Sequence, residues 1–153
     1  MAKIQYMTII LVEDDPGHAR LIKKNLRRSH IANDIITFGD GQQALDYMFG
    51  EVKYEGHSHD FPLLVLLDLN LPVLDGYQVL QRMKSDNRTK HTPVIILTTT
   101  DDQREISRCY DLGCNVYITK SVDYEVFSAA IRNLGLFLTI VMIPDRNKHN
   151  VRD

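Results

Sequence analysis

The stretch LLVLLDLNLP, residues 63–72, decides the fold of this chain. Its first five residues are all apolar, without the alternation that marks a strand facing water on one side. Such a strand is buried on both faces, as in a parallel sheet that helices cover from both sides. The apolar run stops at Asp68. A carboxylate is therefore expected at the carboxyl end of an interior strand.

Four more short apolar runs indicate strands, and they lie at Thr8–Val12, Ile35–Phe38, 94–97 and 116–118. Between the runs, apolar residues recur at helical spacing. The last helix is the clearest, because Asp123 suits an N-cap and the apolar residues after it share one face: Val126, Phe127, Ala130, Ile131 and Leu134. Strict alternation of strands and helices predicts an α/β domain with a doubly wound, five-stranded parallel sheet.

The composition fits one domain, because 153 residues with 44% hydrophobic content are too few for two conventional cores. We expect a domain over residues 1–144 and a flexible polar tail over 145–153. The formal net charge of -2 and the lack of a dense basic run argue against a nucleic-acid partner. The chain shows no signal peptide and no long apolar run, so we expect a cytoplasmic protein without a membrane partner.

Two residue pairs invite a metal or redox interpretation. Cys109 and Cys114 lack the CxxC spacing and have no ligand cluster beside them, so we interpret them as packing residues. His57 and His59 lie in the long connection before residue 63. They would form either a metal pair or part of a solvated loop, and the loop is favoured because no other ligand type accompanies them.

Polar side chains follow four of the five predicted strands. Ligands of open parallel sheets bind beyond the carboxyl ends of the strands, where the strand order reverses. The groups expected at that edge are Glu13-Asp14-Asp15, Asp68, Thr98-Thr99-Thr100 and Thr119-Lys120. Each group alone is typical of a polar loop, but their convergence from four places in the sequence indicates a functional site.

The charges of these groups predict a metal ion and a reaction. Glu13, Asp14 and Asp68 would repel one another by several kcal/mol unless a cation intervenes. Oxygen ligands in a partly open site suit Mg²⁺. With Mg²⁺ and Lys120 present the formal charges cancel, so the site accepts a phosphoryl group. Asp68 would then attack an activated phosphoryl donor while the Thr98 hydroxyl binds a phosphoryl oxygen, which gives an acyl phosphate.

Over about residues 7–138 the chain resembles the receiver domain of two-component response regulators. The motifs that carry the resemblance are VEDD at 12–15, LDLNLP at 67–72 with Asp75-Gly76 after it, LTT at 97–99 and YITK at 117–120. The resemblance implies a flavodoxin-like (βα)5 fold with a C-terminal extension. It also implies phosphorylation of Asp68 by the phosphohistidine of a sensor histidine kinase, with no enzymatic activity beyond the protein's own phosphotransfer and dephosphorylation.

Roles for individual residues follow from the same resemblance. Asp14 and Asp68 would bind Mg²⁺ through side chains, Asn70 through its backbone carbonyl, and Glu13 through water. Thr98 and Lys120 would bind the phosphoryl oxygens. Thr98 and Tyr117 would move together as the switch.

One departure concerns the residue after the lysine, which is usually proline in the family and often follows a cis bond. Here it is Ser121. A cis bond before a non-proline residue costs about 2.5–4 kcal/mol, so either the bond is trans with a displaced loop or the fold sustains the strain. The sequence YITKS, the long loop before residue 63 and the apolar C-terminal stretch are similar to stand-alone regulators of phytochrome-type kinases. They point to a phytochrome as the kinase partner.

The apolar stretch 134–143 extends beyond the end of an ordinary domain of this kind. It either folds back on the core or exposes an apolar patch. From the second possibility we predict a homodimer through the last helix and the extension.

Three other functions compete with the phosphorylated switch. A haloacid-dehalogenase-like phosphohydrolase needs an aspartate where Asn70 stands. A flavin binder needs a hydroxyl-rich loop where the acidic triplet 13–15 stands. A phosphorylation-incompetent receiver that serves as a protein-binding scaffold stays open because of Ser121.

Overall fold

The structure is a computed structural model that describes residues 7–50 and 63–139. In this part of the chain five strands alternate with five helices. The strands are β1 (Thr8–Val12), β2 (Ile35–Phe38), β3 (Leu63–Leu67), β4 (Val94–Thr98) and β5 (Val116–Thr119). The helices are α1 (Pro16–Arg28), α2 (Gly41–Phe49), α3 (Gly76–Lys84), α4 (Gln103–Leu112) and α5 (Tyr124–Leu138). All strand pairs are parallel, in the order β2-β1-β3-β4-β5, which confirms the predicted sheet.

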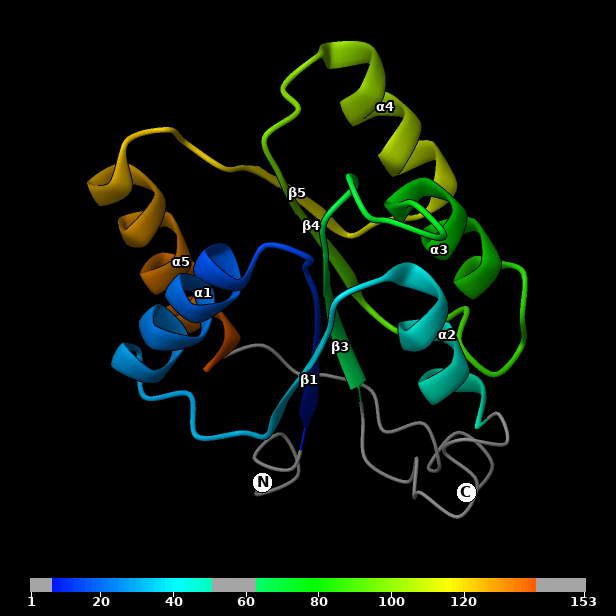
Figure 1. The fold of residues 1–153 in the computed structure, drawn as a ribbon, viewed down its shortest axis with the longest axis horizontal. Helices are drawn as coiled ribbons and strands as arrows, with labels where there is room; N and C mark the ends of the chain where they lie inside the picture. Colours follow the sequence, from blue (N-terminus) through cyan, green and yellow to red (C-terminus); the bar gives the residue numbers. More distant parts are fainter. Residues whose placement is uncertain (1–6, 51–62, 140–153) are drawn as a thin grey trace.

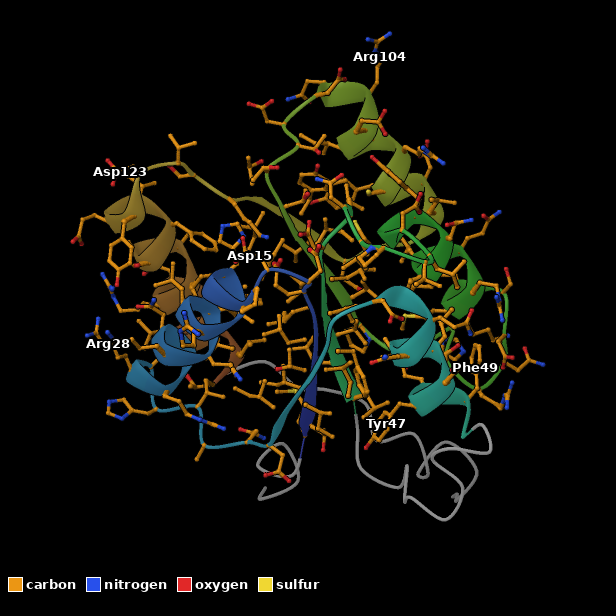
Figure 2. All side chains as sticks on the ribbon, in the orientation of Figure 1. Asp15, Arg28, Tyr47, Phe49, Arg104 and Asp123 are labelled. Carbon is orange, nitrogen blue, oxygen red and sulfur yellow. The ribbon has the colours of Figure 1, made fainter. Side chains whose placement is uncertain are left out.

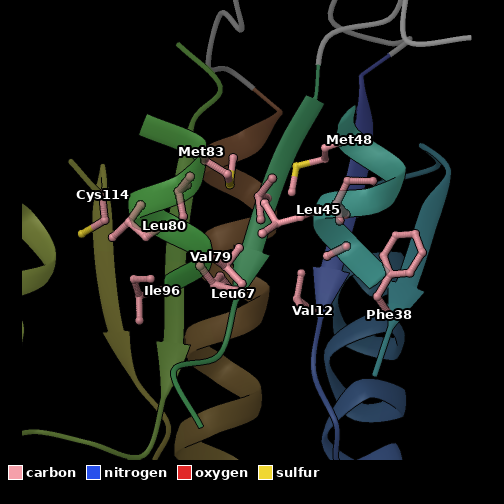
Figure 3. Close-up of a cluster of buried hydrophobic side chains, with 14 of the residues drawn as sticks. Val12, Phe38, Leu45, Met48, Leu67, Val79, Leu80, Met83, Ile96 and Cys114 are labelled. Carbon is pink, nitrogen blue, oxygen red and sulfur yellow. The ribbon is translucent and has the colours of Figure 1, made fainter. Parts of the chain in front are cut away.

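Helices cover both faces of the sheet, with α1 and α5 on one side and α2, α3 and α4 on the other (Figure 1). Alternate residues of each central strand enter different cores, so that in β3 Val65 and Leu67 join the α2–α4 side while Leu64 and Leu66 join the α1–α5 side. Figure 3 shows the first of these cores around Leu67. Every residue of β3 is buried, which is why its sequence shows no polar alternation.

β4 and β5 each extend one residue further than predicted, to Thr98 and Thr119. These two threonines are partners in the parallel ladder, so pairing continues past the apolar residues. A strand prediction based on hydrophobicity alone therefore ends one residue too early in β4 and in β5.

All five helices begin with an aspartate N-cap. Each aspartate side chain accepts hydrogen bonds from backbone N–H groups of the first turn, and the residues are Asp15, Asp40, Asp75, Asp102 and Asp123. Figure 2 shows Asp15 and Asp123 at the starts of α1 and α5. The predicted cap at Asp123 is confirmed. Caps of this kind contribute about 1 kcal/mol each, so they define where each helix begins.

α1 and α5 pack closely against each other. The Ser29 hydroxyl donates to the Arg132 carbonyl at 2.9 Å. A Cβ at Gly135 would lie 2.5 Å from the Ser29 Cβ, so only glycine permits this approach. α5 contributes six buried residues to the domain.

α4 is attached differently, because Cys109 is its one buried residue. Leu112 packs, partly buried, against the same core, and polar links to α3 lie nearer the surface. The Tyr77 hydroxyl donates to Glu105 Oε1 at 2.5 Å, and the Arg108 guanidinium lies 4.0 Å from the centre of the Tyr77 ring.

α4 ends at Leu112 and is capped by Gly113, which has a φ of 110°, and the Cys114 N–H donates to the Cys109 carbonyl at 3.0 Å. This is the hydrogen-bond pattern of a Schellman motif, in which the flanking side chains make an apolar contact. Both cysteines are free and buried, which confirms that they are packing residues. Burial raises the pKa of each thiol to about 11.

Some expectations concern residues outside the described ranges. His57, His59, the end of the apolar stretch from residue 140, and the predicted tail at 145–153 all lie there. Within the described ranges, none of the helices is long and apolar enough to cross a membrane.

Candidate functional site

The strand order reverses between β1 and β3, and the acidic residues lie at the carboxyl ends of these two strands. Val12 pairs with Leu67, so Glu13 and Asp68 leave the sheet side by side. The Asp68 N–H donates to the Val12 carbonyl at 3.1 Å. Carboxylate oxygens of Glu13, Asp14 and Asp68 all lie within 4.8 Å of one another. The structure therefore brings together the three carboxylates that the sequence predicted.

Lys120 reaches this cluster from the end of β5. Its Nζ donates to Glu13 Oε1 at 2.5 Å and to Asp68 Oδ2 at 3.2 Å. Lys120, Glu13 and Asp68 are all buried, whereas Asp14 is exposed. Burial raises the pKa of Glu13, and the nearby ammonium opposes that shift without cancelling it.

No peptide bond in the described ranges is cis, so the bond between Lys120 and Ser121 is trans. The backbone N–H of Lys120 donates to the Thr98 carbonyl at 2.6 Å, which fixes the start of the loop against β4. Of the two geometries that Ser121 left open, the chain adopts the trans bond. Lys120 nevertheless contacts Asp68.

Thr98 ends β4 and is fully buried. Among the described residues, its hydroxyl is one of two buried side-chain groups with no hydrogen-bond partner. A buried hydroxyl without a partner costs about 1–3 kcal/mol, so it favours a ligand that supplies an acceptor.

Tyr117 lies on β5 and is partly buried. Its hydroxyl donates to the Thr100 carbonyl at 2.6 Å, in the loop that follows β4. Burial raises the pKa of Tyr117 to about 12, so the phenol remains a donor at neutral pH. The two predicted switch residues, Thr98 and Tyr117, are thus connected to the same loop.

The loop after Asp68 folds back against it. Asn70 is exposed, and its backbone N–H donates to Asp68 Oδ1 at 3.4 Å. A Cβ at Gly76 would lie 2.3 Å from the Asp68 carbonyl oxygen, so glycine is required where α3 begins. Asp75 therefore caps α3, and Gly76 allows the start of α3 to approach the backbone of Asp68.

His18 belongs to the site, and the sequence did not predict it. Its Nδ1 lies 3.2 Å from Lys120 Nζ. His18 is in the first turn of α1, whereas the polar groups predicted for the site follow the ends of strands. The sequence did offer one signal for His18, since it lies three residues after Asp15, the last member of the acidic triplet.

The donor set is composed of carboxylate oxygens, which suits a hard divalent cation. Two of the three carboxylates are buried and only one lysine offsets their charge, so a cation relieves the remaining repulsion. The residues present therefore fit the predicted metal ion.

A doubly wound sheet with an aspartate, a lysine and a hydroxyl at its switch point defines a receiver-type signalling domain. The chain belongs to the response regulator receiver family, since the family model for the response regulator receiver domain matches residues 9–132.

Three relatives illustrate the similarity. A response regulator receiver domain from Rhodospirillum rubrum is 56% identical, with a TM-score of 0.84 over 90% of this chain and 97% of that one. The phosphorylated cyanobacterial phytochrome response regulator RcpA is 36% identical, with a TM-score of 0.84 over 92% and 99%. The response regulator Rcp1 of Synechocystis is 34% identical over 89% of this chain and 92% of its own length. A structure of Rcp1 in its Mn²⁺-bound form has a TM-score of 0.81, covering 90% of this chain and 98% of that one at 33% identity.

Proposed function

We propose that this response regulator accepts a phosphoryl group on Asp68 from a sensor histidine kinase in a Mg²⁺-dependent step, and signals through its own surface. The observation that carries the proposal is the pairing of buried Asp68 with buried Lys120 at 3.2 Å, beside two further carboxylates. A purely structural ion pair needs neither the extra carboxylates nor the unpartnered hydroxyl of Thr98.

In this step an Asp68 carboxylate oxygen bonds to phosphorus while the phosphorus–nitrogen bond to the kinase histidine breaks. The electron pair of that bond stays on the imidazole. Lys120 offers its ammonium to the transferring phosphoryl oxygens, and Thr98 Oγ1 offers its unused hydrogen bond. Later attack of water on the acyl phosphate regenerates Asp68, so both reactions concern the protein itself.

Asp14 and Asp68 would hold Mg²⁺ through side chains, Asn70 through its carbonyl and Glu13 through water. When bound, the ion supplies positive charge that allows an anionic phosphoryl group to approach the carboxylates. The Mn²⁺-bound form of Rcp1, a relative of this chain, supports a divalent ion here.

The resemblance to RcpA and Rcp1 supports a phytochrome-type histidine kinase as the donor, because RcpA is a phytochrome response regulator. We further propose that the protein is cytoplasmic and has neither a nucleic-acid nor a membrane partner.

The proposal of a homodimer rests on the exposed apolar side chains of α5. Val126, Leu136 and Phe137 are each more than half exposed, at 56%, 54% and 51%. Light scattering at tens of micromolar should give the mass of a dimer, and Leu136→Glu should reduce it. A monomer mass for the unmodified protein would contradict this proposal.

The phosphorylation proposal is tested with acetyl phosphate or phosphoramidate, with and without Mg²⁺, followed by intact mass and peptide mapping. We expect one Mg²⁺-dependent adduct that Asp68→Asn abolishes. Asp111→Asn, on α4 and away from the site, is the matched control and should retain it. An adduct that survives Asp68→Asn would refute the assignment, and the absence of any adduct would favour the phosphorylation-incompetent scaffold.

A further inference from the structure

His18 connects α1, α5 and the site described above. Its Nδ1 lies 3.2 Å from Lys120 Nζ, while its distances to Glu13 Oε2 and Asp15 Oδ2 are 3.9 Å and 3.8 Å. The lysine contact is therefore the one within hydrogen-bonding distance. His18 is partly exposed, so burial alone does not account for the position of its ring beside Lys120.

The direction of this hydrogen bond follows from the chemistry of the two groups. A lysine ammonium has three donors and no acceptor. In this hydrogen bond the ammonium donates and His18 Nδ1 is the acceptor. Together with Glu13 Oε1 and Asp68 Oδ2, His18 Nδ1 provides one acceptor for each of the three N–H groups of Lys120.

The three acceptors of Lys120 differ in charge. Glu13 and Asp68 are anionic and belong to the candidate metal site. His18 offers a ring nitrogen in place of a carboxylate, so it orients the ammonium without bringing a further negative charge to it. That charge is the property that phosphoryl binding requires of Lys120.

The ring of His18 also contacts a residue of α5. It meets the ring of Phe127 edge to face, with the ring centroids 6.4 Å apart and an interplanar angle of 71°. Phe127 is itself buried in the α1–α5 core. Two contacts on different elements thus orient the imidazole toward Lys120.

We infer that His18 is a positioning residue for Lys120, holding the ammonium in the site through the hydrogen bond at Nδ1 so that it meets the incoming phosphoryl group. This inference rests on the proposed phosphoacceptor function of Asp68. It assigns the first turn of α1 a direct part in forming the phosphoryl site.

The test uses beryllofluoride, a phosphoryl mimic, in the presence of Mg²⁺, with ¹⁹F NMR of the bound mimic as the readout. His18→Leu removes the acceptor and should raise the beryllofluoride concentration needed for half occupancy about tenfold, with a changed ¹⁹F shift. His18→Asn places an amide oxygen near the position of Nδ1 and should restore most of the affinity. His18→Gln places its amide near Nε2 and should not.

The matched control is Arg20→Leu, since Arg20 is an exposed residue of the same helix. It should bind beryllofluoride like the unmodified protein. Thermal unfolding by circular dichroism checks that each variant is folded.

The outcomes separate the two proposals. If the unmodified protein binds no beryllofluoride, the phosphoacceptor function is wrong. If it binds and His18→Leu binds equally well, the role of His18 is refuted. An equal loss in the Leu and Asn variants would also refute it, because the loss would then not depend on an acceptor at the Nδ1 position.

Discussion

Replacing Lys120 by methionine tests the electrostatics of the site without any phosphoryl donor. Lys120 Nζ contacts buried Glu13 at 2.5 Å and buried Asp68 at 3.2 Å. Methionine keeps much of the volume but leaves both carboxylates without their cation. The free energy of unfolding should fall.

Removing one partner of a buried ion pair costs about 3–5 kcal/mol, because an uncompensated charge remains. Proton uptake limits this loss, since burial already raises the pKa of Glu13. Without Lys120 the pKa of Glu13 rises further, so the folded variant binds a proton more readily than the unfolded chain does. Its stability therefore falls as pH rises through that pKa. We expect a loss of about 3 kcal/mol at pH 8 and a smaller loss at pH 5.

The assay is urea unfolding followed by circular dichroism, in EDTA and again in Mg²⁺. Mg²⁺ should restore part of the lost stability, because a cation then returns to the carboxylates. Lys84→Met is the matched control. Lys84 Nζ donates to the Lys90 and Thr92 carbonyls, at 3.1 Å and 2.9 Å, so its loss leaves no carboxylate unpaired.

Two results would refute this reasoning. A loss below about 1 kcal/mol at pH 8 would show that the carboxylates do not depend on Lys120. A Mg²⁺ response of Lys120→Met no larger than that of Lys84→Met, whose acidic site keeps its lysine, would show that Mg²⁺ does not replace the lost cation.

Three further predictions concern packing and backbone conformation. Gly76→Ala should lower the free energy of unfolding by about 3 kcal/mol in urea titrations, since its Cβ would lie 2.3 Å from the Asp68 carbonyl oxygen. Val73→Asn should raise Tm by about 3 °C, because Val73 has a φ of 69° and asparagine tolerates this conformation better. An unchanged Tm would show that the backbone at Val73 is not strained. Cys109 and Cys114 should resist alkylation at pH 8 in the folded protein but not in urea, because a pKa of about 11 keeps each thiol protonated.

The sequence predicted the sheet and Asp68 well for one physical reason. A strand buried on both faces has an apolar sequence, and its end is visible as the first carboxylate. Glu13, Thr98 and Lys120 followed from the same rule applied to other strands. The order of the strands follows from no single segment, because it depends on how each crossover packs; only the resemblance to the flavodoxin-like fold implied it.

Features that depend on contact between distant segments were missed. His18 and Lys120 are 102 residues apart, and their hydrogen bond requires α1 to lie beside the end of β5. The left-handed conformation of Val73 was likewise not expected, because β-branched residues rarely adopt it. The family resemblance marked Ser121 as a departure, yet only the fold shows that Lys120 reaches Asp68 across a trans bond.

The single buried residue of α4 has a consequence for the dynamics of the domain. An element with few buried apolar contacts opens at a lower free energy than the global unfolding reaction. Local opening of α4 would break the surface link from Tyr77 to Glu105 while α1 and α5 stay packed around Ser29 and Gly135. Amide hydrogens of α4 should therefore exchange with deuterium before those of α1 and α5, which makes α4 the helix most readily repositioned by a change at the site.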